Sequence, residues 1–300
     1  MFERARTHSV RGMTTQQQTW IITGATRGFG YALTLEALRR GDNVVAAVRR
    51  PTALDEIVAE WPGRVAVCEF DAASTDGVDT VVDIARERFG NVDVLVNNAG
   101  QGIVGAAEEV SEAELRAGMD LHLHVPAALV RAVLPTMRAQ GSGTIVQMSS
   151  QGGRLSFPGI GAYSAGKFAL EGWSEALAGE VAPFGIRVML VEPSRFRTAF
   201  NEPDVLRVVE RSSVYGDLLD DVRANMAAGD GVQEGDPARA ARIIADVVHG
   251  PDVPLRLPLG AEAVRRIDGS HRAGLANVER WAETAVAADF PGVPASVRPF

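Results

Sequence analysis

The sequence predicts an α/β protein with a doubly wound, mainly parallel sheet that carries helices on both faces, in a single domain. Short apolar runs alternate with helical patterns along most of the 300 residues, at the spacing of βαβ units. A glycine-rich segment, 24–30, joins the first apolar run directly to the first helical pattern. No linker or low-complexity segment divides the chain before its last quarter. With 46% hydrophobic and 23% charged residues, the composition is that of an ordinary globular protein.

The expected elements follow one another in a regular order. The helical pattern after the glycines ends at Gly41, a typical helix-stop residue. Ser111 and Glu114 have the spacing of a capping box and open a long helix. Strands are expected at 20–23, 44–48, 65–70, 92–96, 143–149, 186–191 and 255–259, and helices up to 40 and at 54–60, 75–89, 111–139, 163–182, 236–249 and 261–290.

Composition and charge exclude several classes of protein. The net charge of −8 and the pI near 5.3 argue against a general nucleic-acid binder, which carries a basic excess. The single cysteine, Cys68, excludes an internal disulfide and stands in an apolar run, where we expect it to pack. No run reaches the roughly 18 apolar residues of a membrane span, and residues 1–18 lack the apolar region of a secretory signal. We therefore expect a cytoplasmic protein without membrane contact, preceded by a disordered tail at 1–18.

The segment Gly24–Gly30 is the first chemical signal. Its spacing, G-x-x-x-G-x-G, lies between the first strand and the first helix of a βαβ unit. Glycines there let the backbone approach a pyrophosphate, which lies against the N-terminus of the helix. Turns also use glycine routinely, so the position in the βαβ unit carries the inference; the absence of G-x-x-x-x-G-K-[ST] disfavours a nucleoside triphosphatase. The expected nucleotide contacts are Gly24, Thr26, Arg27, Gly28, Phe29 and Gly30.

The end of the second strand distinguishes between the two dinucleotides. A site for NAD normally places Asp or Glu there to hold the ribose hydroxyls. Here the strand ends in Arg49 and Arg50, and Arg27 adds a cation inside the glycine loop. Forked guanidinium donors suit the 2′-phosphate of NADP. We therefore expect NADP(H) rather than NAD(H), with Arg27 and Arg49 at the phosphate; the alternative is that Arg49 and Arg50 are solvated loop residues.

The second chemical signal is Tyr163 followed by Lys167, with Ser150 thirteen residues before the tyrosine. Positions i and i+4 share one face of a helix. A phenol titrates near pH 10, and a neighbouring ammonium lowers that pKa. Such a tyrosine can exchange a proton with an alcohol or carbonyl oxygen, to which Ser150 can also hydrogen-bond. The alternative is an ordinary surface pair, but the surrounding strands and the glycine segment favour catalysis.

The long helix contains His122, His124 and Pro126. The two histidines point to different faces of a helix and cannot share a metal. Five histidines and one cysteine in the whole chain give a metal site little support, so we expect none. Pro126 lacks the N–H that would bond the carbonyl of His122. The helix should therefore either kink there or offer that carbonyl to a water molecule.

Together these motifs resemble the classical short-chain dehydrogenase/reductase family over roughly residues 19–200, with weaker likeness to about 260. The resemblance rests on Thr23–Gly30, Asn97–Gly100, Ser150, Tyr163–Lys167, and Glu192–Pro193 with Thr198. It implies a Rossmann-type catalytic domain at 19–260 with a seven-stranded parallel sheet, followed by a helical extension at 261–300. It also implies metal-free, NAD(P)-dependent oxidation or reduction of alcohols and carbonyls.

The resemblance also assigns roles to the matching positions. Tyr163 would be the acid/base, Lys167 would lower its pKa and hold the nicotinamide ribose, and Ser150 would polarise the substrate oxygen. The further cofactor contacts would be Gly24, Gly28 and Gly30 at the pyrophosphate, Asp71 at the adenine, Asn98 on the adenosine side, Gly100 beside it in the motif, and Thr198 at the nicotinamide amide.

Three positions depart from the family pattern. His122 stands where the family has Asn, at a helix kink whose main-chain carbonyl holds a water linking the lysine to solvent. Because Pro126 would free that same carbonyl, we expect the relay to survive through the backbone, with His122 as a candidate catalytic residue. Gly166 replaces the common Ser before the lysine, and Ser194 replaces the usual Gly after the proline. Both should affect the geometry of the cofactor loops.

These observations predict an NADP-dependent oxidoreductase that interconverts a carbonyl and a secondary alcohol. The alternative is an NADP(H)-binding regulatory or structural homologue with little turnover. The segment 194–234 is expected to cover the pocket with apolar residues, which suggests an apolar substrate, unless those residues only pack neighbouring helices. Family members commonly pair through the helix carrying Tyr163 and the long helix before it, so a homodimer or homotetramer is implied.

Overall fold

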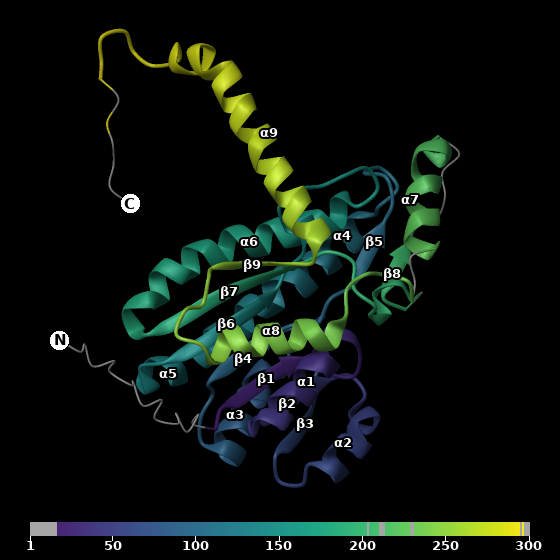
Figure 1. Cartoon of the computed structure of the whole chain (residues 1–300), viewed down its shortest axis with the longest axis vertical. Coiled ribbons are helices and arrows are strands. Elements are labelled where there is room, and N and C mark those ends of the chain that lie inside the picture. The colour runs from purple at the N-terminus through teal and green to yellow at the C-terminus, as the bar shows by residue number, and fades with distance from the viewer. Residues whose placement is uncertain (1–16, 203, 210–213, 229–230, 295, 297–300) are drawn as a thin grey trace, which may run out of the picture.

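Seven parallel strands form the centre of the molecule, in the spatial order β3-β2-β1-β4-β6-β7-β9 (Figure 1). The computed structural model describes residues 17–202, 204–209, 214–228, 231–294 and 296. The strands are β1 (Thr19–Thr23), β2 (Asn43–Val48), β3 (Val65–Glu69), β4 (Val94–Asn97), β6 (Gly143–Met148), β7 (Ile186–Pro193) and β9 (Arg256–Leu259). The predicted single, doubly wound parallel domain is confirmed, and each strand lies within about two residues of its predicted range.

Helices cover both faces of this sheet. They are α1 (Gly28–Arg40), α2 (Asp55–Glu60), α3 (Val78–Phe89), α4 (Glu112–Met119), α5 (Val125–Gln140), α6 (Gly161–Val181), α7 (Gly216–Ala228), α8 (Pro237–His249) and α9 (Ala261–Val286). Along β1, Trp20 and Ile22 face the apolar cluster under α1 and α8, whereas Ile21 faces the cluster under α3 and α5. This alternation explains why three consecutive residues, Trp20–Ile22, are apolar: a parallel strand is buried on both sides.

The long helix expected at 111–139 is interrupted. A π turn, η2 (Asp120–His124), separates α4 from α5, and the N–H of Val125 donates to the carbonyl of Asp120, five residues back. Such wide turns inside helices occur often at functional sites. The turn lies immediately before Pro126, which cannot donate to the carbonyl of His122. The irregularity expected at the proline is thus present as a widened turn.

A second, small sheet was not predicted. Strand β5 (Gly102–Val104) pairs in parallel with β8 (Leu206–Val208) above the carboxyl ends of the main strands. It attaches the segment after β7 to the segment after β4. The order of the main sheet reverses between β1 and β4, because β2 and β3 lie on one side and β6, β7 and β9 on the other. Ligands bind at such a switch point in open α/β sheets.

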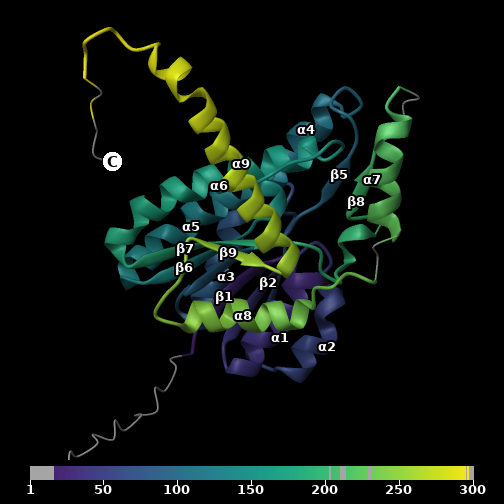
Figure 2. The ribbon, with the colours of Figure 1, turned by 45° about the horizontal axis from the view of Figure 1, so that its top comes forward.

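The two ends of the described chain differ in their contacts. Gln17 and Gln18, placed in the tail by sequence, hydrogen-bond to Gly41 and Asp42. Helix α9 projects away from the sheet, and only Ala263 and Ile267 within it are buried (Figures 1 and 2). Among the described residues, no helix combines the length and apolar character needed to cross a membrane.

Candidate active site

A cavity of about 820 Å³ opens at the carboxyl edge of the sheet, where the strand order reverses. All but one of the predicted site residues line it, and Gly30 is the exception. The lining residues among them are Gly24, Thr26, Arg27, Gly28, Phe29, Arg49, Asp71, Asn98, Gly100, His122, Ser150, Tyr163, Lys167 and Thr198.

The glycine loop forms one wall of the cavity. Gly24 and Gly28 have φ of +68° and +57°, a left-handed conformation that favours glycine. A Cβ on Gly30 would lie 2.3 Å from the carbonyl oxygen of Gly24, so Gly30 allows α1 to pack against the loop. Gly30 was expected to contact the pyrophosphate, but it does not line the cavity. The side-chain amide of Asn98 donates to the carbonyls of Thr23 and Gly24, at 2.8 and 3.3 Å, and thereby holds the loop.

This wall fits the pyrophosphate of a dinucleotide. The first turn of α1 carries no acidic residue, and its N-cap, Arg27, makes no side-chain capping bond. The free N–H groups and the positive end of the helix dipole therefore face the cavity without a competing carboxylate of their own helix. Arg27, Arg49 and Arg50 line the same end of the cavity. There the guanidinium of Arg27 forms ion pairs with Glu202 and Asp204, which the sequence did not suggest.

Ser150, Tyr163 and Lys167 line the same cavity. Ser150 directly follows β6, and Tyr163 lies in the first turn of α6. The Ser150 hydroxyl accepts from the N–H of Gly152 at 3.0 Å. It lies close to the phenol of Tyr163, because a Cβ on Gly152 would contact both side chains, and it lowers the pKa of that phenol. The phenol ring lies edge-on between His122 and Phe200, with centroid distances of 5.5 and 5.8 Å. The ring is therefore held in place by packing, with its hydroxyl beside that of Ser150.

Burial dominates the electrostatics of this group. It raises the pKa of Tyr163 to about 12, against a smaller lowering by the bond to Ser150. It also lowers the pKa of Lys167 to about 8, against an opposing effect of the Glu171 carboxylate. The ammonium of Lys167 donates to the carbonyl of Met148 at 2.7 Å and lies 5.8 Å from the Tyr163 ring centroid. The pKa of Tyr163 is thus raised, not lowered as Lys167 led us to expect, because burial of the phenol dominates.

Glu171 is a buried acid that sequence reasoning missed. Its two oxygens accept from the hydroxyl of Ser149 at 2.5 Å and from the Nε of Arg256 at 2.9 Å. It stands four residues after Lys167 on α6, a spacing that places both on one face of the helix. That spacing was the available signal. An acid one turn beyond the lysine helps to keep the lysine protonated.

His122 and Gly166, two of the departures from the family pattern, are in contact. A Cβ on Gly166 would lie 2.9 Å from the Cβ of His122, closer than side-chain atoms normally approach. The imidazole is buried, and its Nε2 lies 2.9 Å from the carbonyl oxygen of Gln101, which can only accept. Burial and then the Lys167 ammonium hold the pKa of His122 well below its usual value. Gly166 therefore makes room for a neutral imidazole where the family has a smaller amide.

The third departure also has a structural explanation. The hydroxyl of Ser194 donates to the carbonyl of Leu259 at 3.3 Å, and a Cβ on Gly260 would lie 2.3 Å from the Ser194 oxygen. Gly260 has φ of +90°. Ser194 thus joins the end of β7 to the turn between β9 and α9, at the rim of the cavity.

The outer part of the cavity is mainly apolar. Residues of the segment 194–234, the loop after Ser150 and the first turns of α9 contribute to it. The contributors are Phe157, Ile160, Phe200, Leu206, Leu218, Val222 and Met226, together with the charged Glu262 and Arg266. Described residues of the segment 194–234 therefore line the cavity, and the apolar ones among them do more than pack neighbouring helices.

Comparisons with known proteins agree with this architecture. The family description "short chain dehydrogenase" matches residues 18–206. The chain is 34% identical over 269 residues to oxidoreductase BOA17 of Botryotinia fuckeliana (strain B05.10), covering 89% of this chain and 98% of that protein. It is 40% identical over 187 residues to a 3-ketodihydrosphingosine reductase of Bacteroides thetaiotaomicron, covering 62% of this chain and 67% of that protein.

A solved structure shows the same fold. The crystal structure of a short-chain dehydrogenase from Streptomyces avermitilis superposes with a TM-score of 0.86 at 42% sequence identity, covering 92% of this chain and all of that one. The family match extends over more than half of the chain and includes the glycine loop, Ser150, Tyr163 and Lys167. The chain therefore belongs to the short-chain dehydrogenase/reductase family, as an NAD(P)-dependent oxidoreductase acting on CH–OH groups.

Proposed function

We propose that the protein is an NADP(H)-dependent reductase of apolar ketones that also oxidises the corresponding secondary alcohols. The observation that carries this proposal is the meeting of Tyr163, Ser150 and Lys167 in one cavity with the glycine loop. The cations Arg27, Arg49 and Arg50 near the end of β2, with no acid among the residues that end that strand, support NADP(H) over NAD(H).

In this proposal Tyr163 and Ser150 together hold the substrate oxygen. The two side chains lie next to one another, since a Cβ on Gly152 would contact both, so both hydroxyls can turn to one oxygen atom between them. A phenol with a pKa of about 12 is protonated at neutral pH, the form that donates to an oxygen becoming an alkoxide. The Lys167 ammonium then stabilises the negative charge left on the phenol oxygen. The nicotinamide cofactor, when bound, supplies the hydride.

We propose that His122 serves this group through its backbone. Its carbonyl belongs to the π turn, and Pro126 cannot donate to it. A water on this carbonyl would link Lys167 to solvent, the role that the family resemblance gives to this part of the helix. The imidazole itself occupies the space left by Gly166 and donates to Gln101.

An apolar ketone fits the outer cavity best. Its lining includes Phe157, Ile160, Phe200, Leu206 and Met226, which would bury alkyl or ring carbons. The relative from Bacteroides thetaiotaomicron is named for reduction of a ketone on a long alkyl chain. We therefore place ketones with long alkyl chains first among the candidate substrates, ahead of cyclic ketones and quinones.

The test is consumption of NADPH by the purified protein with a panel of ketones of increasing chain length, followed by absorbance. We expect kcat/KM to rise with chain length and NADPH to be used more efficiently than NADH. Tight binding of NADPH without consumption, with every member of the panel, would contradict the enzyme and favour the regulatory homologue.

Tyr163→Phe tests the assigned chemistry. The variant keeps the ring between His122 and Phe200 and removes only the hydroxyl, so kcat/KM should fall by about 10²- to 10⁴-fold while the melting temperature stays near that of the wild type. Tyr31→Phe is the matched control, because Tyr31 lies half-exposed on α1 outside this cavity. A Tyr163→Phe variant with full activity would sink the mechanism.

Exposed apolar side chains on two helices support self-association of the protein. The side chains of Leu115 on α4 and Phe168 on α6 are exposed, on the helices through which the family resemblance implies pairing. We propose a homodimer or homotetramer, and light scattering after gel filtration measures its mass.

A cytoplasmic location fits the free, buried thiol of Cys68.

A further inference from the structure

Arg27, the cation of the glycine loop, is already held by two carboxylates from a distant segment. Its Nη2 lies 2.7 Å from Oδ2 of Asp204, and its Nη1 lies 3.1 Å from Oδ1 of the same side chain. Nη1 also lies 2.9 Å from Oε2 of Glu202. Asp204 thus receives the guanidinium in the forked manner that suits a phosphate equally well.

Asp204 stands where the phosphate of NADP would be recognised, and Glu202 binds the same guanidinium. Asp204 lines the cavity together with Arg27, Arg49 and Arg50. The bond to Arg27 holds the pKa of Asp204 below its usual value, and Arg50 adds a smaller contribution of the same sign. The carboxylate of Asp204 is therefore within electrostatic reach of two cations at the end of the cavity next to β2.

A 2′-phosphate and these carboxylates cannot contact Arg27 at the same time without a loss of binding free energy. A phosphate monoester carries about −1.5 to −2 charges at neutral pH, and Glu202 and Asp204 carry two more. Like charges around one guanidinium repel, so the guanidinium has to exchange carboxylates for phosphate oxygens. A ribose with a free 2′-hydroxyl brings no such charge, and NAD leaves the ion pairs intact.

We propose that Glu202 and Asp204 are specificity-determining residues that compete with the 2′-phosphate for Arg27 and weaken NADP(H) binding without weakening NAD(H) binding. The inference rests on the proposed NADP(H) site and deepens it. Binding of NADP(H) releases residues 202 and 204 from the glycine loop, whereas binding of NAD(H) does not.

The rest of this segment has its own attachments. Strand β8 pairs with β5, and the N–H of Val209 donates to the carbonyl of Val104 at 2.9 Å. Nη2 of Arg207 forms an ion pair with Oε1 of Glu114, on α4, at 2.7 Å. These contacts do not involve Arg27. They can hold the segment in place when Arg27 exchanges its partners. Removing one of them tests whether any weakening of this segment changes cofactor binding.

The test measures binding of NADP⁺, NAD⁺, 2′,5′-ADP and 5′-AMP by isothermal titration calorimetry. The variants are Asp204→Asn and the double variant Glu202→Gln/Asp204→Asn. We expect about three- to tenfold tighter binding of NADP⁺ and 2′,5′-ADP by the double variant, the size of two exposed ion pairs. Binding of NAD⁺ and 5′-AMP should stay within about twofold. The gain should shrink as salt rises, because these groups are exposed.

Arg207→Gln is the matched control, since it removes an ion pair from the same segment without touching Arg27. It should change the four affinities equally or not at all. The competition would be overturned if the double variant bound all four ligands more tightly than the wild type, or if it bound none of them more tightly.

Arg27→Gln separates this inference from the proposed function. Weaker binding of NADP⁺ but not of NAD⁺ would confirm Arg27 as the phosphate ligand, and an unchanged double variant would then overturn the competition alone. Unchanged affinity of Arg27→Gln for NADP⁺, in an enzyme that turns over with NADH as efficiently as with NADPH, would overturn the NADP(H) preference itself and the competition with it.

Discussion

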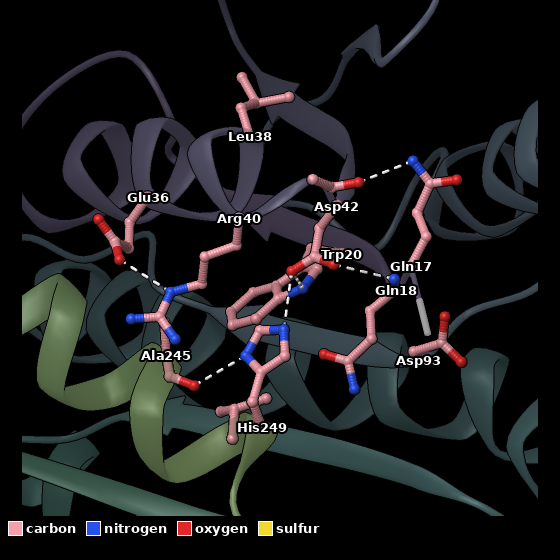
Figure 3. A network of polar contacts seen from close by, with 12 residues as sticks. Gln17, Gln18, Trp20, Glu36, Leu38, Arg40, Asp42, Asp93, Ala245 and His249 are labelled. Carbon is pink, nitrogen blue, oxygen red and sulfur yellow. Dashed lines mark hydrogen bonds and ion pairs between the residues drawn. The ribbon is translucent and has the colours of Figure 1, made fainter. Parts of the chain in front are cut away.

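The two edges of the central sheet treat their buried polar groups differently. At the amino edge, the buried Asp42 accepts hydrogen bonds on both carboxylate oxygens (Figure 3). Oδ1 accepts from the N–H of Gln18 at 2.9 Å, and Oδ2 from the indole N–H of Trp20 at 3.0 Å. His249, which stacks on Trp20, lies 3.0 Å from the same Oδ2. One carboxylate thus joins β1, the turn before β2 and the end of α8.

At the carboxyl edge, some buried polar atoms lack such partners. Within the part of the chain that the structure describes, Nδ1 of His122 and Oε1 of Gln151 are buried without a hydrogen-bond partner. Lys167 is buried and Tyr163 is partly buried, and the pKa values of both are shifted toward their neutral forms. Unpartnered buried polar atoms and shifted pKa values are typical of sites that await a ligand. Changes at the amino edge should therefore cost stability, and changes at the carboxyl edge should cost turnover.

Asp42→Ala should give the largest loss of stability. It leaves the indole of Trp20 and the imidazole of His249 without their acceptor, and removing one partner of a buried pair costs about 3–5 kcal/mol. We expect the free energy of unfolding in urea to fall by that amount, while kcat of the folded fraction stays unchanged. Asp42→Asn, which keeps one acceptor oxygen, should lose less.

Asp246→Ala is the control for Asp42. Asp246 forms an ion pair with Arg40 at 2.7 Å on the same side of the molecule, but its side chain is 69% exposed. Its loss should cost less than about 1 kcal/mol. Equal losses of unfolding free energy in Asp42→Ala and Asp246→Ala would contradict this prediction, because burial of the carboxylate would then not determine the loss.

Gly166→Ala should be the next largest change. The new Cβ would lie 2.9 Å from the Cβ of His122, which is the base of a side chain and cannot swing away. Overpacking of this kind costs about 1–3 kcal/mol. Gly172→Ala, on the same helix, meets no atom within 4 Å and should stabilise the protein by about 0.5–1 kcal/mol. The same substitution should thus have opposite signs at two positions of α6, measured by urea denaturation.

His122→Asn tests whether the contact explains the glycine. Asn keeps the Cβ but lacks the imidazole Cδ2, which would lie 3.2 Å from the new Cβ. The double variant His122→Asn/Gly166→Ala should therefore lose at least about 0.5 kcal/mol less than the sum of the single variants. Additive losses would show that the two departures from the family pattern are unrelated.

The strands and the glycine loop could be predicted because their signals are local. Parallel strands buried on both faces are unbroken apolar runs such as Val44–Val48, and glycines between a strand and a helix mark a turn. Strands β5 and β8 escaped prediction because each has only three residues, too few to show a period.

The finer parts of the site depend on contacts between distant residues. The partners of Arg27 lie 175 and 177 residues away, and no local period encodes such a pair. The packing of His122 against Gly166 likewise joins the π turn to α6. Position in the sequence identified Tyr163 and Lys167, but their pKa values follow from burial, which the fold decides.

The smallest expected effect concerns two histidines, one at each edge of the sheet. The pKa of the half-buried His249 is raised, and that of the buried His122 is lowered. Both ring nitrogens of His249 face oxygen acceptors, Asp42 at 3.0 Å and the carbonyl of Ala245 at 2.8 Å, so the ring carries two protons. The bond to Asp42 raises the pKa of His249, against burial and the nearby Arg40. Burial, then the Lys167 ammonium, lowers the pKa of His122.

The shifts act on stability in opposite directions. A raised pKa stabilises the fold fully below the unfolded value of about 6.5, and this contribution is lost as the pH rises through the folded value. A lowered pKa contributes above about 6.5, and that contribution is lost as the pH falls toward the folded value. Urea unfolding of the wild type, His249→Gln and His122→Asn between pH 5 and 9 measures both. The deficit of His249→Gln should shrink as the pH rises, and that of His122→Asn should shrink as the pH falls. Parallel pH dependences would mean that the two edges hold their histidines in the same charge state, and the division of labour between them would fail.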